Sequence, residues 1–418
     1  MIRVWSDREN AGLLDRHGER GASFAYDPQA DQHRAVSLTM PVRLASWDVA
    51  VGLHPIFEMN LPEGYLRERL RLAFAKATGR FDDLDLLSII GRSQIGRLRY
   101  TAPDAVLDEA VPFQSVDEIL SQRRSGELFA YMVERFAVHS GISGVQPKVM
   151  IRDEAGSAVL AQGENIHAFQ GATHIVKFWD PNEYPHLAAN EFFCLLAAEK
   201  AGLAVPRRQL SQDGSALVID RFDLRADGSY IGIEDFCVLN GKGTARKYDG
   251  SYETNLIKRM KEYIPGETRK AELEKLFTLL VLNAAIRNGD AHLKNFALVY
   301  DDVTGVPRLA DIYDIVTTTV YLPKDAMALT LEGSTRWPDR KQLIKLGTLR
   351  CGLAPAEVAA VFERVAAGLT EAMVEMERYA DSEPGFAPIA AEMKAQWLAG
   401  MASSLHIAHP MAVSVEVV

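Results

Sequence analysis

The sequence predicts an α+β protein of two lobes, with short strands in the first part of the chain and helices in the second. Runs of β type recur up to Asp223, whereas beyond Glu234 apolar residues repeat at the 3.6-residue period of amphipathic helices. The 418 residues are 48% hydrophobic and 24% charged, the balance of an ordinary globular protein. This length suggests roughly two or three domains. We therefore expect the two lobes to meet at a cleft.

We expect the first hundred residues to form a small α+β module. A helix is expected between Pro62 and Gly79, because apolar residues recur there at helical spacing. A connector with two prolines and several acids follows over 102–125. The β-type runs of the module are 2–5, 23–27 and 35–40. We expect three domains: an N-terminal module over 1–105, a strand-rich lobe with the connector over 106–233, and a helical lobe over 234–418.

The strand-rich lobe contains one expected helix, from Asn190 to Ala201, which ends at Gly202. Its β-type runs are 145–152, 157–161, 173–179, 207–210 and 216–223. The helical lobe has one expected hairpin, formed by 296–300 and a return through Leu309. Its expected helices are 254–263, 271–288, 342–349, 356–380 and 389–405. The most apolar segment, 276–286, is too short to span a membrane and is typical of a buried helix.

Charge and cysteine usage exclude several classes of protein. The chain has 46 basic and 56 acidic residues, a net charge of −10, so DNA contact would need a local patch or a basic partner. Cys194, Cys237 and Cys351 form no CxxC pair, which argues against a disulfide framework or a structural zinc site and fits a reducing cytoplasm. Charged residues among the first ten argue against a secretory signal. Zinc hydrolase and serine esterase motifs do not occur.

The sharpest local motif is Asn-Gly-Asp-Ala-His-Leu-Lys-Asn over 288–295, directly after the buried helix. Asp290 and Asn295 have the D-x-x-x-x-N spacing of a kinase catalytic loop, in which the carboxylate accepts a hydroxyl proton and the amide oxygen holds magnesium. Loop Asp and Asn residues are also common turn formers. A second carboxylate follows the expected hairpin, where Asp314 is favoured over Asp311 as a metal ligand.

The strand-rich lobe offers residues for a nucleotide. Lys177 lies in the middle of an apolar strand, where an ammonium group is costly unless it is paired or faces a ligand. Glu191 follows near the start of the next helix, as in the Lys–Glu pair that orients ATP phosphates in kinases. An edge strand with its lysine in water is the alternative. The segment 141–148 has two glycines that permit close backbone approach to phosphate. The loop 240–244 lacks Walker spacing and is rejected as a phosphate loop, although its basic residues could contact an acidic substrate.

Together these segments resemble the HipA family of bacterial serine/threonine kinases, the toxin halves of toxin–antitoxin pairs. The resemblance rests on motifs at 57–62, 141–148, 173–178, 190–192, 220–223, 234–237, 288–295 and 313–314. It implies a two-lobed protein-kinase-like fold with an N-terminal α+β module and with ATP between the lobes.

The resemblance also implies a role for individual residues. Asp290 is the implied catalytic aspartate, and Asn295 and Asp314 are the implied Mg²⁺ ligands. The implied ATP-binding residues are Gly144, Val145, Lys148, Lys177, Glu191, Asp220, Arg221, Phe222, Asp223, His292 and Lys294, of which 220–222 form the adenine hinge and Asp223 lies beside the ribose. Ser143 is the implied autophosphorylation site. Because Gly141 stands at the first loop position used by some members, Ser140 remains an alternative.

The partners follow from the same resemblance. It implies a small helix-turn-helix antitoxin of HipB type that binds this chain and operator DNA, so that DNA contact is made only through the antitoxin. It also implies a protein substrate of the translation apparatus, such as an aminoacyl-tRNA synthetase, and a cytoplasmic protein with no membrane partner. Two alternatives stay open: a pseudokinase that acts as an antitoxin-binding co-repressor, and a kinase for a small molecule.

Overall fold

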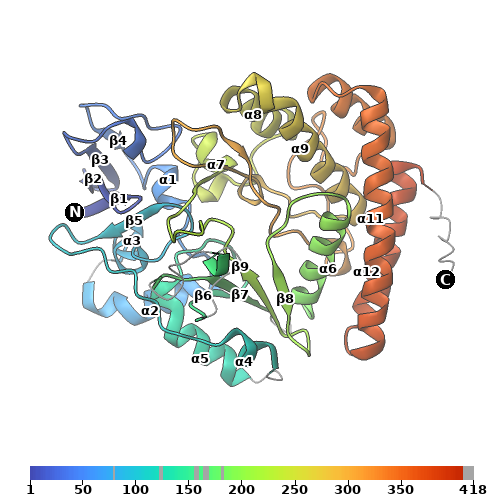
Figure 1. The fold of residues 1–418 in the computed structure, drawn as a ribbon, viewed down its shortest axis with the longest axis horizontal. Helices are drawn as coiled ribbons and strands as arrows, with labels where there is room; N and C mark the ends of the chain where they lie inside the picture. The colour runs from blue at the N-terminus through green and yellow to red at the C-terminus, as the bar shows by residue number, and fades with distance from the viewer. Residues whose placement is uncertain (79–80, 122–125, 155–159, 163–168, 180–182, 408–418) are drawn as a thin grey trace. The chain divides into compact units, whose positions relative to one another are not determined.

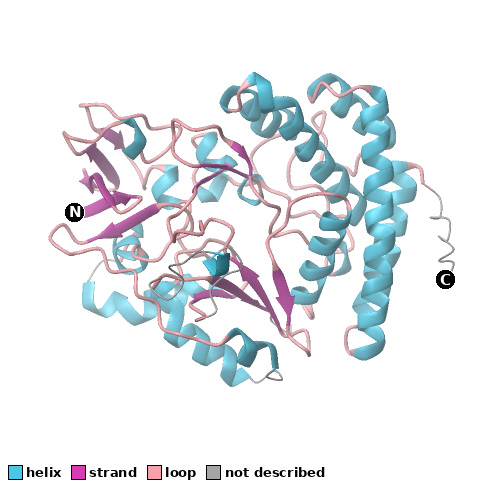
Figure 2. Cartoon of the chain, in the orientation of Figure 1, coloured by secondary structure: helices cyan, strands magenta, loops and turns pink. Residues whose placement is uncertain are grey.

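A computed structural model describes residues 1–78, 81–121, 126–154, 160–162, 169–179 and 183–407. Contacts within the chain define two compact units. The first unit comprises 1–188, 206–247 and 296–310, and the second comprises 189–205, 248–295 and the chain from 311 onward. All strands of the described residues belong to the first unit, whereas the second unit is helical (Figure 2). The predicted boundaries after residues 105 and 233 stay predictions of domain organisation.

The N-terminal module contains a five-stranded antiparallel sheet in the order β4-β3-β2-β1-β5 (Figure 1). Its strands are β1 (Ile2–Ser6), β2 (Glu9–His17), β3 (Gly21–Tyr26), β4 (Trp47–Val49) and β5 (Leu98–Thr101). Its helices are α1 (Pro55–Glu58), α2 (Gly64–Thr78) and α3 (Asp83–Ile90). Phe24, Phe57 and Tyr100 form the aromatic core, with ring centroids 5.1 and 6.1 Å apart. Asp82 caps α3 through a reciprocal capping box with Asp85, which fixes where this helix starts.

Two further antiparallel sheets complete the first unit. A four-stranded sheet has the order β6-β7-β9-β8, and a three-stranded sheet has the order β10-β11-β12. These strands are β6 (Lys148–Ile151), β7 (His174–Phe178), β8 (Arg208–Leu210), β9 (Ala216–Asp220), β10 (Gly232–Asp235), β11 (Ala297–Tyr300) and β12 (Arg308–Leu309). The accompanying helices are α4 (Val116–Ser121), α5 (Gly126–Phe136) and α7 (Phe236–Leu239).

The second unit is built around α9, whose C-terminal half is buried on all sides. Its helices are α6 (Leu187–Lys200), α8 (Lys258–Tyr263), α9 (Gly266–Ile286), α10 (Arg340–Lys345), α11 (Pro355–Ser382) and α12 (Ala387–Gly400). The predicted apolar stripe of α11, from Val358 to Met376, is buried. Gly400 permits close packing of α12 on α9, because a Cβ there would lie 1.9 Å from the Ala285 carbonyl oxygen. Among the described residues, none of the helices combines the length and the hydrophobicity that a membrane span requires.

Three sequence predictions of secondary structure are wrong. Residues 35–40 form no strand beyond a single Ser37–Met40 bridge, because the Leu38 amide donates to the Glu234 carboxylate instead of to a neighbouring strand. In the predicted strand 157–161, Leu160 lies in a 3₁₀ turn, and 157–159 lie outside the described residues. Gly79, the predicted end of a helix, also lies outside the described residues. The expected connector contains α4, and its last residues, 122–125, are not described.

Four strands were not expected from the sequence: β2, β4, β5 and β10. The last of these lies where the chain was expected to turn helical. Cys194, Cys237 and Cys351 are buried free thiols. Burial raises the pKa of both Cys194 and Cys351 to about 12, so these thiols stay protonated and unreactive.

Candidate active site

The loop after α9 is set by asparagine contacts at the helix end. Arg287 ends α9 in the left-handed conformation (φ 60°), and the Asn288 amide donates to the Asn283 carbonyl at 2.9 Å. The two buried side chains also bond to each other, with Asn288 Nδ2 3.0 Å from Asn283 Oδ1. Asn288 Oδ1 then accepts from the Asp290 amide at 3.1 Å. The Asn-x-Asp sequence therefore turns the chain sharply and fixes the backbone of Asp290.

Gly289 is required at this turn for steric reasons. A Cβ on Gly289 would lie 2.0 Å from Asp325 Oδ2. The Gly289 amide donates to Thr318 Oγ1 at 2.8 Å, and the Thr318 hydroxyl in turn donates to Asp325 Oδ2 at 2.5 Å. This close backbone approach is one that only glycine allows, and it anchors the loop to the segment around 318–325.

The Asn295 side chain links the two carboxylate-bearing segments of the second unit. Its Nδ2 donates to the backbone carbonyl of Asp290 at 2.8 Å and to that of Asp314 at 3.3 Å. Asp314 has a left-handed backbone (φ 56°), uncommon for a residue other than glycine. The Tyr313 hydroxyl also donates to the Lys294 carbonyl at 2.9 Å, a second bond between the same segments. The structure therefore brings the backbones of Asp290 and Asp314 to the side chain of Asn295, and the catalytic and metal-binding roles of these residues stay predictions.

Three other predicted site residues of the second unit are buried. His292 and Lys294 belong to the same loop, and the Nε2 atom of His292 lies 4.0 Å from Asp290 Oδ1. Glu191 is fully buried in α6. Its neighbour Asn190 fixes the segment that follows Asp314, because it exchanges two hydrogen bonds with the Thr317 backbone at 2.8 and 3.1 Å.

In the first unit, two buried lysines face one another. Lys148 of β6 and Lys177 of β7 are directly opposite in the antiparallel register, and each is 4% exposed. Directly opposite residues put their side chains on the same face of a sheet, about 5 Å apart at Cβ. Two positive charges on one face favour a bound anion such as a polyphosphate. From the cost of burying an ammonium group, the sequence predicts an anionic ligand for Lys177 alone. The strand register places Lys148 on the same face of the sheet.

The predicted phosphate loop, 141–148, is shaped by its glycines. Gly144 has a φ of 118°, and a Cβ there would lie 2.3 Å from Lys148 Nζ, so the ammonium group approaches the loop backbone. A Cβ on Gly141 would lie 2.0 Å from Gln94 Nε2, which explains why a serine does not fit this position. Val145 at the tip is exposed.

The two candidate serines of this loop differ in environment. Ser140 is fully buried, and its hydroxyl donates to the Phe136 carbonyl at 2.7 Å and accepts from the Met150 amide at 2.9 Å. Ser143 is half-buried, and its hydroxyl donates to Glu63 Oε1 at 2.5 Å. Glu63 Oε2 in turn lies 2.9 Å from Lys247 Nζ.

The predicted hinge is held by buried charges. His174 Nε2 lies 3.3 Å from Asp220 Oδ1. Arg221 and Asp223 form a bidentate ion pair, with N–O distances of 2.9 and 2.5 Å, and both are almost fully buried. The pair also binds the N-terminal module: Arg221 donates to the Gln94 carbonyl at 2.8 Å, and the Gly96 amide donates to Asp223 at 2.6 Å. The side chains of Arg221 and Asp223 thus hold the backbone at Phe222 in place.

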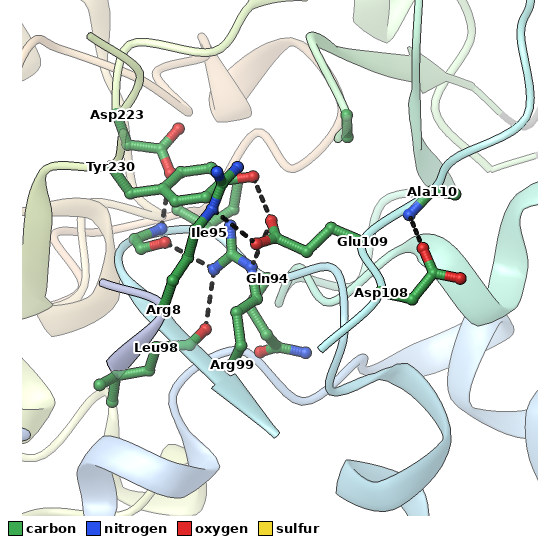
Figure 3. Close-up of polar contacts among 12 residues, drawn as sticks. Arg8, Gln94, Ile95, Leu98, Arg99, Asp108, Glu109, Ala110, Asp223 and Tyr230 are labelled. Carbon is green, nitrogen blue, oxygen red and sulfur yellow. Dashed lines mark hydrogen bonds and ion pairs between the residues drawn. The ribbon is translucent and has the colours of Figure 1, made fainter. Parts of the chain in front are cut away.

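A second buried cluster of the first unit consists of Arg99, Glu109 and Tyr230 (Figure 3). Arg99 lies 3.1 Å from Glu109 Oε2 and 3.8 Å from the centroid of the Tyr230 ring, and the Tyr230 hydroxyl donates to Glu109 at 2.5 Å. Burial alone would raise the pKa of Glu109, but Arg99 and the Tyr230 hydroxyl outweigh it and lower that pKa. Glu109 is therefore held as a carboxylate within this cluster.

Comparison with known proteins assigns the family. The HipA-like C-terminal domain matches residues 140–373, which is more than half of the chain, and the HipA N-terminal domain matches residues 2–101. The chain belongs to the HipA family. Two relatives from Sinorhizobium fredii are named "Putative kinase Y4dM" (31% identical, covering 66% of this chain) and "Putative kinase Y4mE" (29% identical, covering 79%). The chain spans 65% of the length of the first and 80% of the second.

Among solved structures, the HipA-family chain is similar to one from Shewanella oneidensis MR-1. That structure is a complex of the toxin–antitoxin system HipA, HipB and its operator DNA. The TM-score is 0.66 at 18% sequence identity, and the match covers 98% of each chain. The prediction of an α+β, kinase-like fold with an N-terminal HipA-type module is thus confirmed.

The residues present fit a cation that also binds phosphate. No group of three or more His, Cys, Asp or Glu side chains within the described part of the HipA-family chain could hold a metal ion. Magnesium at kinase sites takes only one or two protein ligands and completes its shell with phosphate and water oxygens. Because Asn295 uses Nδ2 for both backbone bonds, its Oδ1 is not involved in them, and amide and carboxylate oxygens are suitable ligands for this ion.

Two residues that the sequence does not indicate contact the candidate site. Glu63 contacts Ser143, the Gly144 amide (3.2 Å) and Lys247, although it is 80 residues from the loop. Tyr248 donates to Asp290 Oδ1 at 2.7 Å from 42 residues away. Neither belongs to a recognisable motif, so no signal in a single sequence would have identified them.

Proposed function

We propose that this HipA-family chain is an ATP- and Mg²⁺-dependent serine/threonine protein kinase that acts as the toxin of a type II toxin–antitoxin system. The observation that carries the proposal is the Asn295 side chain, which joins the Asp290 loop to the Asp314 segment. This connection supports a centre for phosphoryl transfer in which the Asp290 carboxylate binds the acceptor hydroxyl and the Asp314 carboxylate would bind the magnesium ion on the phosphates. The names of the relatives and the fold of the toxin–antitoxin structure support the same activity.

In the proposed mechanism, the chain contributes positioning and charge. Lys177, with Lys148 opposite it, binds the phosphates of ATP, and the backbone of 220–222 accepts the adenine. Asp290 orients the acceptor hydroxyl and takes its proton as the γ-phosphoryl group transfers in line. Asn295 and Asp314 would hold Mg²⁺, which supplies neutralisation of the charge that develops on the phosphates. Because phosphoryl transfer needs little covalent chemistry from the protein, placement and electrostatics supply most of the rate.

Ser143 is the proposed site of autophosphorylation. Its hydroxyl is half-buried and bonds to a side chain, whereas the Ser140 hydroxyl is fully buried and tied to two backbone groups. A phosphate on Ser143 would meet the Glu63 carboxylate that now accepts its hydrogen bond, so the loop could not keep this contact.

The proposed partners are a HipB-like helix-turn-helix antitoxin and a protein substrate such as an aminoacyl-tRNA synthetase. The solved HipA, HipB and operator DNA complex supports an antitoxin partner. A net charge of −10 fits DNA contact made only through that partner.

The test is incorporation of labelled phosphate from ATP and Mg²⁺ by purified wild-type protein and by the Asp290→Asn variant. We expect label on the wild-type chain and on a bacterial protein, as phosphoserine, and none with the variant. Label on a small molecule alone would favour the small-molecule kinase. Tight nucleotide binding without any transfer would favour the pseudokinase.

A further inference from the structure

A tyrosine hydroxyl already occupies the proposed catalytic carboxylate. Tyr248 Oη donates to Asp290 Oδ1 at 2.7 Å, within the range of a strong O–H···O⁻ bond. Tyr248 is 50% exposed and the Asp290 side chain is 47% exposed, so the bond forms at the surface of the second unit. A general base must lie at just this distance from the hydroxyl whose proton it takes. The phenol therefore stands where an acceptor hydroxyl would have to stand.

The tyrosine ring is held by its neighbours. Its edge packs against the His292 ring, with centroids 5.0 Å apart and planes at 79°. His292 is itself 5% exposed and so gives the ring a fixed wall. The same segment contacts the loop a second time, because the Tyr252 hydroxyl donates to the Ala291 carbonyl at 3.3 Å.

We propose that Tyr248 marks the acceptor-hydroxyl subsite and is displaced when the hydroxyl of a substrate serine or threonine takes its place on Asp290. This inference rests on the proposed kinase function of Asp290. A half-exposed side chain can leave without opening the core, and the His292 ring then remains as one wall of the subsite. Until an acceptor arrives, the phenol fills this one hydrogen-bonding position on Asp290 Oδ1 in place of a water molecule, and so suppresses transfer of the γ-phosphoryl group to water.

The test is ATP hydrolysis with Mg²⁺ and no acceptor protein, measured as phosphate release. Tyr248→Ala opens the position beside Asp290 to water, so we expect hydrolysis to rise by about ten-fold, the lower end for loss of a charge-assisted hydrogen bond. Tyr248→Phe removes only the hydroxyl and keeps the ring on His292, so a smaller rise is expected. Tyr131→Phe removes a hydroxyl from another exposed tyrosine and serves as the matched control, with a rate equal to wild type.

Two further measurements separate the inference from the proposed function. Affinity for a non-hydrolysable ATP analogue should be unchanged in both Tyr248 variants, because the residue contacts the acceptor side. Hydrolysis by Tyr248→Ala that is equal to or below wild type, with analogue affinity retained, would overturn the acceptor subsite. If wild type transfers phosphate to no acceptor, the kinase function itself fails and the subsite fails with it, whereas equal transfer by wild type and Asp290→Asn would refute the role of Asp290 and with it the subsite. If Asp290→Asn loses transfer while the Tyr248 variants behave as wild type, the subsite alone is wrong.

Discussion

Replacing Asp223 by alanine should destabilise the first unit because it leaves a buried arginine without its counter-charge. Asp223 accepts two bonds from Arg221, at 2.9 and 2.5 Å, and one from the Gly96 amide at 2.6 Å. Arg221 is 1% exposed, so water cannot replace the lost carboxylate. Removal of one partner from a buried ion pair costs about 3–5 kcal/mol. The free energy of unfolding of this unit should fall by that amount.

The assay is urea denaturation followed by intrinsic fluorescence, as a double-mutant cycle. Asp223→Ala, Arg221→Met and the double variant are compared with wild type. With a urea dependence of a few kcal/mol per molar, the single variants should unfold at a urea concentration lower by on the order of 1 M. The double variant removes both charges together, so its loss should be smaller than the sum of the two single losses.

Either of two results would show that Asp223 does not neutralise a buried Arg221. One is a decrease of less than about 1 kcal/mol in the free energy of unfolding for Asp223→Ala, which is the size expected for a solvent-exposed ion pair. The other is strict additivity in the double variant, which would mean that the two side chains do not interact. A matched control is Arg71→Met, which removes an exposed arginine paired with Glu68 and should cost almost nothing.

Three further predictions concern the phosphate face, the loop serines and a buried acid. Lys177→Met should weaken binding of a non-hydrolysable ATP analogue by about ten-fold or more, since a charge-assisted bond is lost; an unchanged affinity in calorimetry would contradict that role. Ser143→Ala should abolish the mass increase of wild type after incubation with ATP, while Ser140→Ala retains it; the opposite pattern would reassign the site. Burial raises the pKa of Glu234 above its ordinary 4.5, so the folded state holds this proton more tightly than the unfolded state. The unfolding free energy of wild type should therefore fall, relative to Glu234→Gln, as pH rises above 4.5. Parallel stability curves for the two proteins would show that Glu234 titrates equally in both states.

The helical half could be predicted in detail because its signals are local. Burial of α9 and of the α11 stripe follows directly from apolar spacing. By contrast, β10 contains Gly232, Glu234 and Asp235, residues depleted from strands. It becomes a strand by pairing with β11, about 65 residues later in the chain, where Glu234 also accepts a hydrogen bond from Tyr300. Such long-range pairing leaves no periodic trace in the segment itself.

The candidate site also combines local contacts, which the sequence predicts, with long-range contacts, which it does not. Asp290 and Asn295 lie five residues apart, so their spacing alone predicts a shared loop, and the structure joins them through one hydrogen bond. The contacts of Glu63 with Ser143 and of Tyr248 with Asp290 depend on how distant segments pack. Opposition of Lys148 and Lys177 depends on strand register, which the sequence does not specify without the turn and the pairing partner.

The proposed kinase function is tested most directly by a crystal structure of the protein with a non-hydrolysable ATP analogue and Mg²⁺. We expect one triphosphate that accepts a hydrogen bond from Lys177 Nζ and shares a magnesium ion with Asn295 Oδ1 and the Asp314 carboxylate. Asp290 would then face the γ-phosphate. A nucleotide bound away from Lys177, or a magnesium ion without Asn295 and Asp314 as ligands, would contradict the proposed function.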